Sequence, residues 1–418
     1  MSPRSSSALL LATATAWDVH TPTNRTCLGG CGCVPRLRAC VPTAPSKDMK
    51  VFAQSLASLA ARGVDLEAIY VVSRASPDVD RVIAKANAAR ARGRRVDFVR
   101  WLDEEGGFPF SYASVKAALE AAGATHGGSY AYAVGWYLQQ LIKLYCGRAI
   151  DRAERSVAGP WNAADVARAP DFDALVVDSD VVWLRDVAFV HAAARDAAGA
   201  CRATYNAAFS REAHGLYYVT NKNLLGAADG APVPDAGGHP VSGVAHHMVF
   251  RSDVVAAIEA RVSKRLGAPL HAALLKPEAG VVKEAHRNAF SEYQLYFHFA
   301  RRVFPGAVRV RQLYWANGPG PRSVAICGGD GWPAHEMRGL RAPTEAVDAD
   351  RTAGYDYVAY HSYAKRRPCV YGPAADRADG GACFGGGCTR DCYKSRADAR
   401  FKARSRERVA PRLCVGEG

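Results

Sequence analysis

The sequence predicts an α/β protein with a Rossmann-like, mostly parallel sheet covered by helices on both faces. Short apolar segments with the length of strands alternate with longer segments that have helical periodicity. One of them, Ala-Leu-Val-Val at residues 174–177, is apolar at every position, as in strands buried on both faces. Alternation of this kind indicates crossover connections, in which each helix links two parallel strands.

The expected elements follow one another along the first half of the chain. Strands are expected at residues 38–43, 68–73, 96–101 and 174–177, and helices at residues 48–62, 78–92 and around 135–146. In such folds the loop after the first strand contacts the nucleotide. Thr43 in this loop is therefore a candidate for binding the nucleotide part of a ligand, although the loop lacks a glycine-rich fingerprint.

Cysteine content divides the chain into three regions. Residues 1–36 form a leader with a possible signal region, residues 37–365 the α/β domain, and residues 366–418 a tail rich in Gly, Cys and Arg. The twelve cysteines crowd the two ends, and only Cys146, Cys201 and Cys327 lie between the clusters. The clusters favour disulfide-stapled extensions. Zinc is the alternative, but the tail lacks the paired C-x2-C spacing of zinc sites.

Charge and hydropathy limit the partners and the location. The 54 Lys and Arg residues outnumber the 40 Asp and Glu residues, so the net charge is +14. No zinc-finger spacing or RNP-like motif accompanies this charge, so we expect no nucleic-acid partner. No apolar run reaches the roughly 18–20 residues of a membrane span. Residues 8–17 read as a short signal peptide and residues 24–26 as a glycosylation sequon, which favours the secretory pathway (Golgi or ER lumen) or secretion.

Two carboxylates follow the apolar strand at 174–177. Asp178 and Asp180 are separated by one residue, so on an extended segment both side chains point to the same side. Together they can hold a hard divalent cation, Mn²⁺ or Mg²⁺, and leave open positions for diphosphate oxygens. The pair therefore predicts a metal site for a nucleotide-sugar donor at the carboxyl edge of the sheet.

Five segments extend this interpretation. They are, in order, GWYLQQLIKL (135–144), VDSD (177–180), HHMVF (246–250), FSEYQLY (290–296) and VAYHSY (358–363). Through these segments, residues 38–363 resemble an uncharacterised family of glycosyltransferases in the GT-A superfamily, of the Asp-x-Asp type. The resemblance implies a GT-A fold and a metal-dependent transferase that uses a nucleotide-sugar donor. It names neither the sugar nor the acceptor, which is a glycan, a protein or a lipid.

The resemblance also implies donor-side roles. Lys143 lies in an Ile-Lys-Leu context similar to that of a donor-binding lysine in glycogenin-like transferases, and Gln140 shares its helix face. His361 is implied as the third metal ligand, although no Lys-Pro-Trp follows it as in glycogenin-like transferases. His246 and His247 are both donor-side candidates. On an extended segment they face opposite sides, so we expect only one of them to enter the site.

Glu292 is the candidate catalytic carboxylate on the acceptor side. Ser291 is expected to cap a helix that begins at Glu292. The acid then either activates the acceptor hydroxyl or only interacts favourably with the helix dipole. Two alternatives to a glycosyltransferase remain open at this point. They are another metal-dependent nucleotide-using transferase, such as a nucleotidyltransferase, and a catalytically inactive, secreted carbohydrate-binding protein.

Overall fold

A computed structural model describes the chain between residues 37 and 371, with gaps. The described residues are 37–44, 49–63, 65–90, 98–122, 130–195, 201–209, 215–234, 241–276, 289–310, 313, 315–319, 356–361 and 369–371. The leader at 1–36 and the tail beyond residue 371 lie outside the described residues. No helix in the described part is long and apolar enough to cross a membrane.

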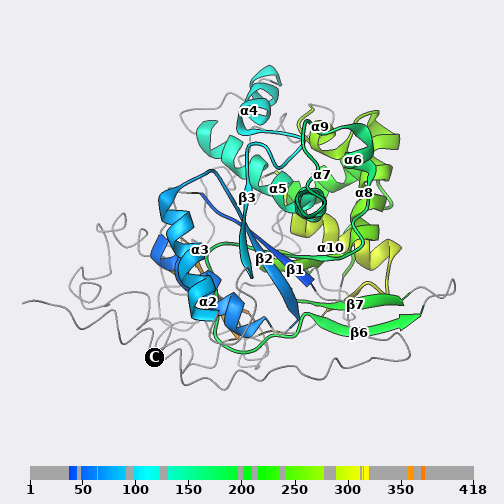
Figure 1. Cartoon of the computed structure of the whole chain (residues 1–418). Helices are drawn as coiled ribbons and strands as arrows, with labels where there is room; N and C mark the ends of the chain where they lie inside the picture. Colours follow the sequence, from blue (N-terminus) through cyan, green and yellow to red (C-terminus); the bar gives the residue numbers. More distant parts are fainter. Residues whose placement is uncertain are drawn as a thin grey trace, which may run out of the picture.

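A five-stranded sheet in the order β3-β2-β1-β4-β8 forms the centre of the molecule (Figure 1). Its strands are β1 (Leu37–Pro42), β2 (Leu66–Ser73), β3 (Val99–Asp103), β4 (Ala174–Val177) and β8 (His247–Phe250). The first four are parallel, whereas β8 runs antiparallel to β4. The start of β8 therefore lies at the same edge as the carboxyl ends of the other four strands.

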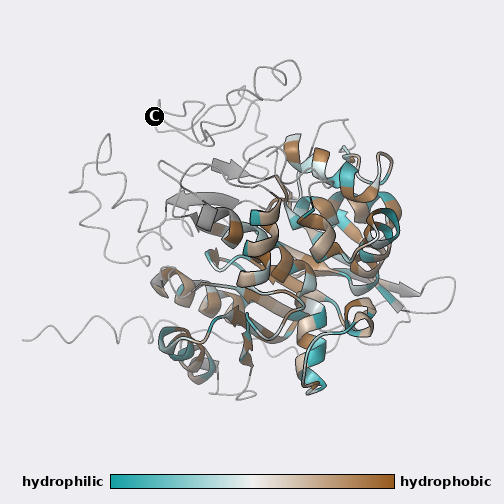
Figure 2. Cartoon of the chain, turned by 90° about the horizontal axis from the view of Figure 1, so that it is seen from above, coloured by the Kyte–Doolittle hydropathy of each residue, from teal (hydrophilic) through white to brown (hydrophobic). Residues whose placement is uncertain are grey.

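Helices cover both faces of this sheet. α2 (Met49–Arg62) and α3 (Pro77–Arg90) lie on one side, and α5 (Tyr130–Glu154), α8 (Ser252–Leu266) and α10 (Glu292–Val303) lie on the other (Figure 1). Alternate residues of β1 enter the two apolar clusters, with Ala39 and Val41 on the α2 side and Cys40 on the α5 side. Figure 2 shows hydrophobic residues concentrated in the centre of the molecule and hydrophilic residues on its outer helices.

The remaining elements surround this core. The further helices are α4 (Tyr112–Ala121), α6 (Ala163–Ala167), α7 (Gly215–Leu225) and α9 (Leu270–Leu274). The side strands are β5 (Val181–Trp183), β6 (Val190–Arg195), β7 (Cys201–Ala207), β9 (Val308–Val310), β10 (Trp315–Pro319), β11 (Tyr357–His361) and β12 (Cys369–Tyr371). They form two sheets in the orders β12-β10-β11-β5 and β6-β7-β9.

The predicted α/β class is confirmed by this topology. β4 has the expected bounds, and β1 and β2 each agree with expectation within two residues. The third strand was expected from residue 96, but β3 begins at Val99, and residues 91–97 lie outside the described part. The helix expected around 135–146 is longer, because α5 runs from Tyr130 to Glu154.

A disulfide joins the central strand to the longest helix. Cys40 of β1 and Cys146 of α5 are fully buried and bonded, with their Cα atoms 6.4 Å apart. By its position in the sequence Cys40 belongs to the amino-terminal group of cysteines, but its side chain faces the core beneath α5 and pairs with a cysteine between the two clusters. The other cysteines of the two clusters lie outside the residues whose side chains are described, so their pairing stays a prediction.

The first test concerns this disulfide. It closes a loop of 106 residues, and disulfides typically stabilise the folded state by about 2–4 kcal/mol because they restrict the unfolded chain. Dithiothreitol should lower the free energy of unfolding of the wild-type protein by about this amount, measured in urea. In the double variant Cys40→Ala/Cys146→Ala, dithiothreitol should no longer cause this drop in the free energy of unfolding. If Cys40 and Cys146 are both alkylated after the protein is unfolded in urea without reductant, the pairing is contradicted.

The second test uses His298 on α10, which is buried at 1% exposure. Its Nδ1 accepts a hydrogen bond from the Val233 N–H at 2.9 Å. Burial, with Arg301 and Arg302 nearby, lowers the pKa of His298 to about 3. Below pH 6.5 the unfolded chain takes up a proton that the folded chain does not bind. Because of this residue, the free energy of unfolding should be about 2 kcal/mol lower at pH 5 than at pH 7.

Urea unfolding at the two pH values checks this expectation. In the His298→Asn variant the side chain retains an acceptor and cannot titrate. The drop in the free energy of unfolding from pH 7 to pH 5 should therefore be about 2 kcal/mol smaller in the variant than in the wild type. Equal losses in the two proteins would show that His298 does not set this pH dependence.

Candidate active site

The acidic pair lies in the turn between β4 and β5. β4 ends at Val177, and the Asp178 carbonyl accepts a hydrogen bond from the Val181 N–H at 3.2 Å, which closes the turn. The Asp178 N–H donates to the His246 carbonyl at 2.9 Å, which fixes the turn against the start of β8. Because β8 is antiparallel, its first residues meet the end of β4, and Val177 pairs with His247.

A buried ammonium group lies beside this turn. Lys143 of α5 is 3% exposed, and its Nζ is 2.5 Å from Asp178 Oδ1 and 2.8 Å from Glu292 Oε1. The same Nζ lies 4.5 Å from the centre of the Tyr293 ring, a cation–π distance. Burial by itself would lower the pKa of Lys143, but Asp178 and Glu292 outweigh it and raise the pKa above its usual value. Lys143 is therefore a permanent internal cation.

Asp178 receives hydrogen bonds on both carboxylate oxygens. Oδ1 accepts from the Tyr293 hydroxyl at 3.2 Å in addition to the Lys143 ammonium, and Oδ2 is 2.9 Å from His246 Nδ1. Burial would raise the pKa of Asp178, but Lys143 and His246 together hold it well below its usual range. With three of its roughly four lone-pair sites engaged, Asp178 can offer about one to a metal ion.

Glu292 is the first residue of α10 and is fully buried. Ser291 caps the helix as expected, with its Oγ accepting from the Gln294 N–H at 3.4 Å. The Glu292 N–H donates to Gln140 Oε1, also at 3.4 Å. Burial raises the pKa of the Glu292 carboxyl, Lys143 opposes the shift, and Asp178 adds to it. A carboxyl group with a raised pKa suits general acid–base chemistry.

The two neighbouring histidines diverge. His246 has a φ of 61°, in the left-handed region that non-glycine residues rarely adopt, and its ring faces Asp178. His247 is fully buried on the α2 side, where its Nδ1 lies 3.0 Å from the Ala245 carbonyl and its ring packs against Trp183 and Tyr357. The structure therefore brings His246, and not His247, to the acidic turn.

The donor set of the turn fits a hard divalent cation in its chemistry, because Asp178 and Asp180 both offer carboxylate oxygens. Asp180 is half-buried in the same turn. His361 ends β11, and Ala359 pairs with Val181, so the backbone of β11 runs toward this turn. The side chain of His361 lies outside the described part. Among the described residues, no three His, Cys, Asp or Glu side chains form a complete ligand set.

Two buried hydroxyl groups lie at the same edge of the sheet. Thr43 follows β1, and Ser179 lies between the two aspartates. Thr43 Oγ1 and Ser179 Oγ have no hydrogen-bond partner within the described part of the chain. Buried polar atoms normally have partners, so this edge is chemically suited to a polar ligand.

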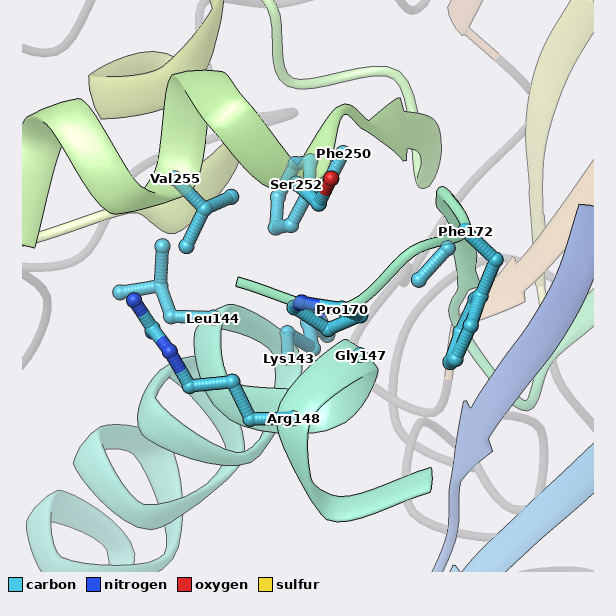
Figure 3. A pocket seen from close by; sticks show the side chains of 10 residues that line it. Lys143, Leu144, Gly147, Arg148, Pro170, Phe172, Phe250, Ser252 and Val255 are labelled. Carbon is cyan, nitrogen blue, oxygen red and sulfur yellow. The ribbon is translucent and has the colours of Figure 1, made fainter. Parts of the chain in front are cut away.

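A small pocket lies at the opposite end of β4 (Figure 3). Its lining comes from α5, from the segment that leads into β4, and from the start of α8. Ala174, the first residue of β4, contributes to it, whereas Asp178 follows the last residue. Arg148, Pro170 and Phe172 surround it in Figure 3. Lys143 also lines this pocket, so the pocket borders the ion cluster, although none of its lining residues belongs to the acidic turn itself.

Tyr293 is the residue of this cluster that sequence reasoning missed. Its helical spacing in α10 is typical of a core position, and it is 2% exposed, but its hydroxyl contacts Asp178. Its place next to Glu292 in the segment at 290–296 was the available signal. A tyrosine placed one turn later, Tyr296, has the same apolar spacing, so the pattern alone does not distinguish the two.

The chain matches no protein-family profile and no curated protein sequence. Two crystal structures of the galactosyltransferase LgtC, one with donor and acceptor sugar analogues and one of an active-site mutant, align with 90% of this chain and 97% of theirs. Identity is 12% in both, with TM-scores of 0.32 and 0.33. The PaToxG glycosyltransferase aligns with 72% of this chain and 76% of its own at 10% identity, with a TM-score of 0.22. The fold of this chain is defined by its own sheet topology.

The third test concerns the buried ion cluster. Lys143→Met leaves Asp178 and Glu292 without their shared cation, so the free energy of unfolding should fall by about 3–5 kcal/mol. Adding Glu292→Gln should recover part of this loss, because one uncompensated carboxylate is removed. Lys116→Met is the control, since Lys116 forms an exposed helix pair with Glu120 worth about 0.2–0.5 kcal/mol. A similar small loss at Lys143 would contradict its role as an internal counter-ion.

Proposed function

We propose that this protein is a metal-dependent glycosyltransferase that moves a sugar from a nucleotide-sugar donor to a glycan, protein or lipid acceptor. The observation that carries the proposal is the buried cluster of Lys143, Asp178 and Glu292 at the carboxyl edge of a mostly parallel sheet. This edge is where open α/β sheets bind nucleotides. A buried charge cluster at such an edge is costly, and ionisable groups perturbed in this way gather at functional sites.

Asp180 would be the principal carboxylate ligand of Mn²⁺ or Mg²⁺, with one lone pair of Asp178 and the imidazole of His361 completing the protein's share. The bound ion would supply charge neutralisation for the departing diphosphate. Thr43 and Ser179 would bind polar groups of the donor, because their buried hydroxyl groups lie at this edge. His246 would orient Asp178 through its 2.9 Å contact.

Lys143 would act on the donor through the two carboxylates. An ammonium group has three N–H donors. In this structure its partners are Asp178, Glu292 and the face of the Tyr293 ring. Gln140 would support the same arrangement by holding the first turn of α10. These two residues would therefore shape the donor site and need no direct contact with the diphosphate.

Glu292 would accept the proton of the acceptor hydroxyl as the sugar is transferred. Its raised pKa brings the carboxyl group closer to neutral pH, where a general base is most effective. We also propose that the protein works in the secretory pathway or outside the cell. The buried Cys40–Cys146 disulfide supports this location, because disulfides persist in oxidising compartments.

The fourth test measures donor hydrolysis. Purified protein should release nucleoside diphosphate from at least one member of a panel of UDP- and GDP-sugars in the presence of Mn²⁺, and EDTA should abolish the release. Asp180→Asn should abolish it as well, while the melting temperature stays near that of the wild type. Asp186→Asn is the matched control, since this nearby aspartate is 71% exposed and pairs with Arg62. Donor binding without any turnover would instead favour the carbohydrate-binding alternative.

The fifth test concerns Glu292. Glu292→Gln keeps the shape of the side chain and removes its basicity, so transfer should fall by roughly 10²–10⁴-fold while the donor dissociation constant hardly changes. Transfer rate, donor affinity and melting temperature should all be measured on the same variant. A nearly normal rate with a lowered melting temperature would limit Glu292 to a structural role beside Lys143.

A further inference from the structure

Tyr293 is held in place by the first turn of α10 and by a close backbone contact. The helix begins beside it at Glu292 under the Ser291 cap. Gly243 packs against the same turn so closely that a Cβ atom there would lie 2.7 Å from the Tyr293 carbonyl oxygen. Gln294 fixes the facing segment further, because its Oε1 accepts from Ser242 Oγ and from the Gly243 N–H, each at 2.9 Å.

The side chain of Tyr293 makes two contacts within the ion cluster. The face of its ring lies 4.5 Å from Lys143 Nζ, and its hydroxyl donates to Asp178 Oδ1 at 3.2 Å. In this contact the phenol is the donor, because an ionised carboxylate oxygen can only accept. Asp178 Oδ1 therefore receives two donors from fixed positions, and its carboxylate is held in one rotation.

We propose that Tyr293 is a positioning residue that orients Asp178 toward the cation site shared with Asp180. The hydroxyl holds Oδ1 on the side of the ammonium group, while His246 contacts Oδ2, and together these contacts direct the remaining lone pair of Asp178 toward the turn. The cation itself rests on the proposed function, whereas the contact between Tyr293 and Asp178 does not.

The chain contains a matched control for this proposal. Tyr296 is also buried on α10, and both tyrosine rings pack against the ring of Phe250. The distance between ring centres is 6.1 Å for Tyr293 and 4.6 Å for Tyr296. The Tyr296 hydroxyl accepts from the Arg251 N–H at 2.9 Å. Replacing either tyrosine with phenylalanine removes one buried hydroxyl and leaves the ring.

The first measurement is Mn²⁺ affinity, followed by electron paramagnetic resonance of the free ion. Removing a group that orients a metal ligand typically weakens binding by roughly 10–100-fold. Tyr293→Phe should show a loss in this range, and Tyr296→Phe should stay within about twofold of the wild type. Equal Mn²⁺ affinities in the two variants would overturn the proposal, because the hydroxyl groups of Tyr293 and Tyr296 would then affect metal binding equally.

The second measurement needs no metal. Melting temperatures of Tyr293→Phe, Asp178→Asn and the double variant should be non-additive in the presence of EDTA, because Tyr293→Phe removes the donor of one hydrogen bond and Asp178→Asn removes the charge of its acceptor. The corresponding set with Tyr296→Phe should be additive. Additive changes in melting temperature in the Tyr293 set would show that Tyr293 and Asp178 do not interact, whatever the protein binds. If the wild type binds no Mn²⁺ but the Tyr293 set is non-additive, the metal centre of the proposed function fails and the positioning contact stands.

Discussion

The arrangement of this molecule around its candidate site depends on one buried charge, the ammonium of Lys143. Burying an ion without partners costs several kcal/mol, so folding has to bring carboxylates to it. Asp178 and Glu292 meet this requirement from positions 35 and 149 residues further along the chain (178 − 143 and 292 − 143). The ion cluster therefore joins α5, the turn after β4 and the start of α10 at a single point, and a displacement of any of them would leave a buried charge uncompensated.

Strand direction determines what surrounds that point. β4 is parallel to β1, so the end of β4 and Thr43 lie at the same edge, whereas the antiparallel β8 brings its beginning there. This reversal places His246 beside Asp178, at a backbone φ of 61°. Such conformations cost of order 1–3 kcal/mol and persist where the surroundings over-determine them. At His246 the surroundings include a backbone and a side-chain contact with Asp178.

The sequence predicted the parallel core well because its signals are local. An apolar run of four residues and regular helical periodicity are enough to place β4, α2 and α3 within a few residues. The site was predicted only in part, because spacing indicates which side chains share a face and not which partner they meet. Lys143 and Gln140 were expected on one helix face, but their contacts with Glu292 depend on tertiary packing. The direction of β8 and the contact of Tyr293 with Asp178 have no local signal either.

Carboxyl groups are concentrated at the turn although the chain as a whole is basic. The chain carries a net charge of +14. At the turn, Asp178 and Glu292 share the ammonium of Lys143, and Asp180 adds a third carboxyl group two residues after Asp178. A divalent cation held by Asp178 and Asp180 would offset part of this acidic character, and a diphosphate bound to that cation would meet less repulsion from the carboxylates. This local concentration of carboxyl groups supports the proposed metal-dependent transfer through the chemistry of the side chains, in addition to the spacing of the motif.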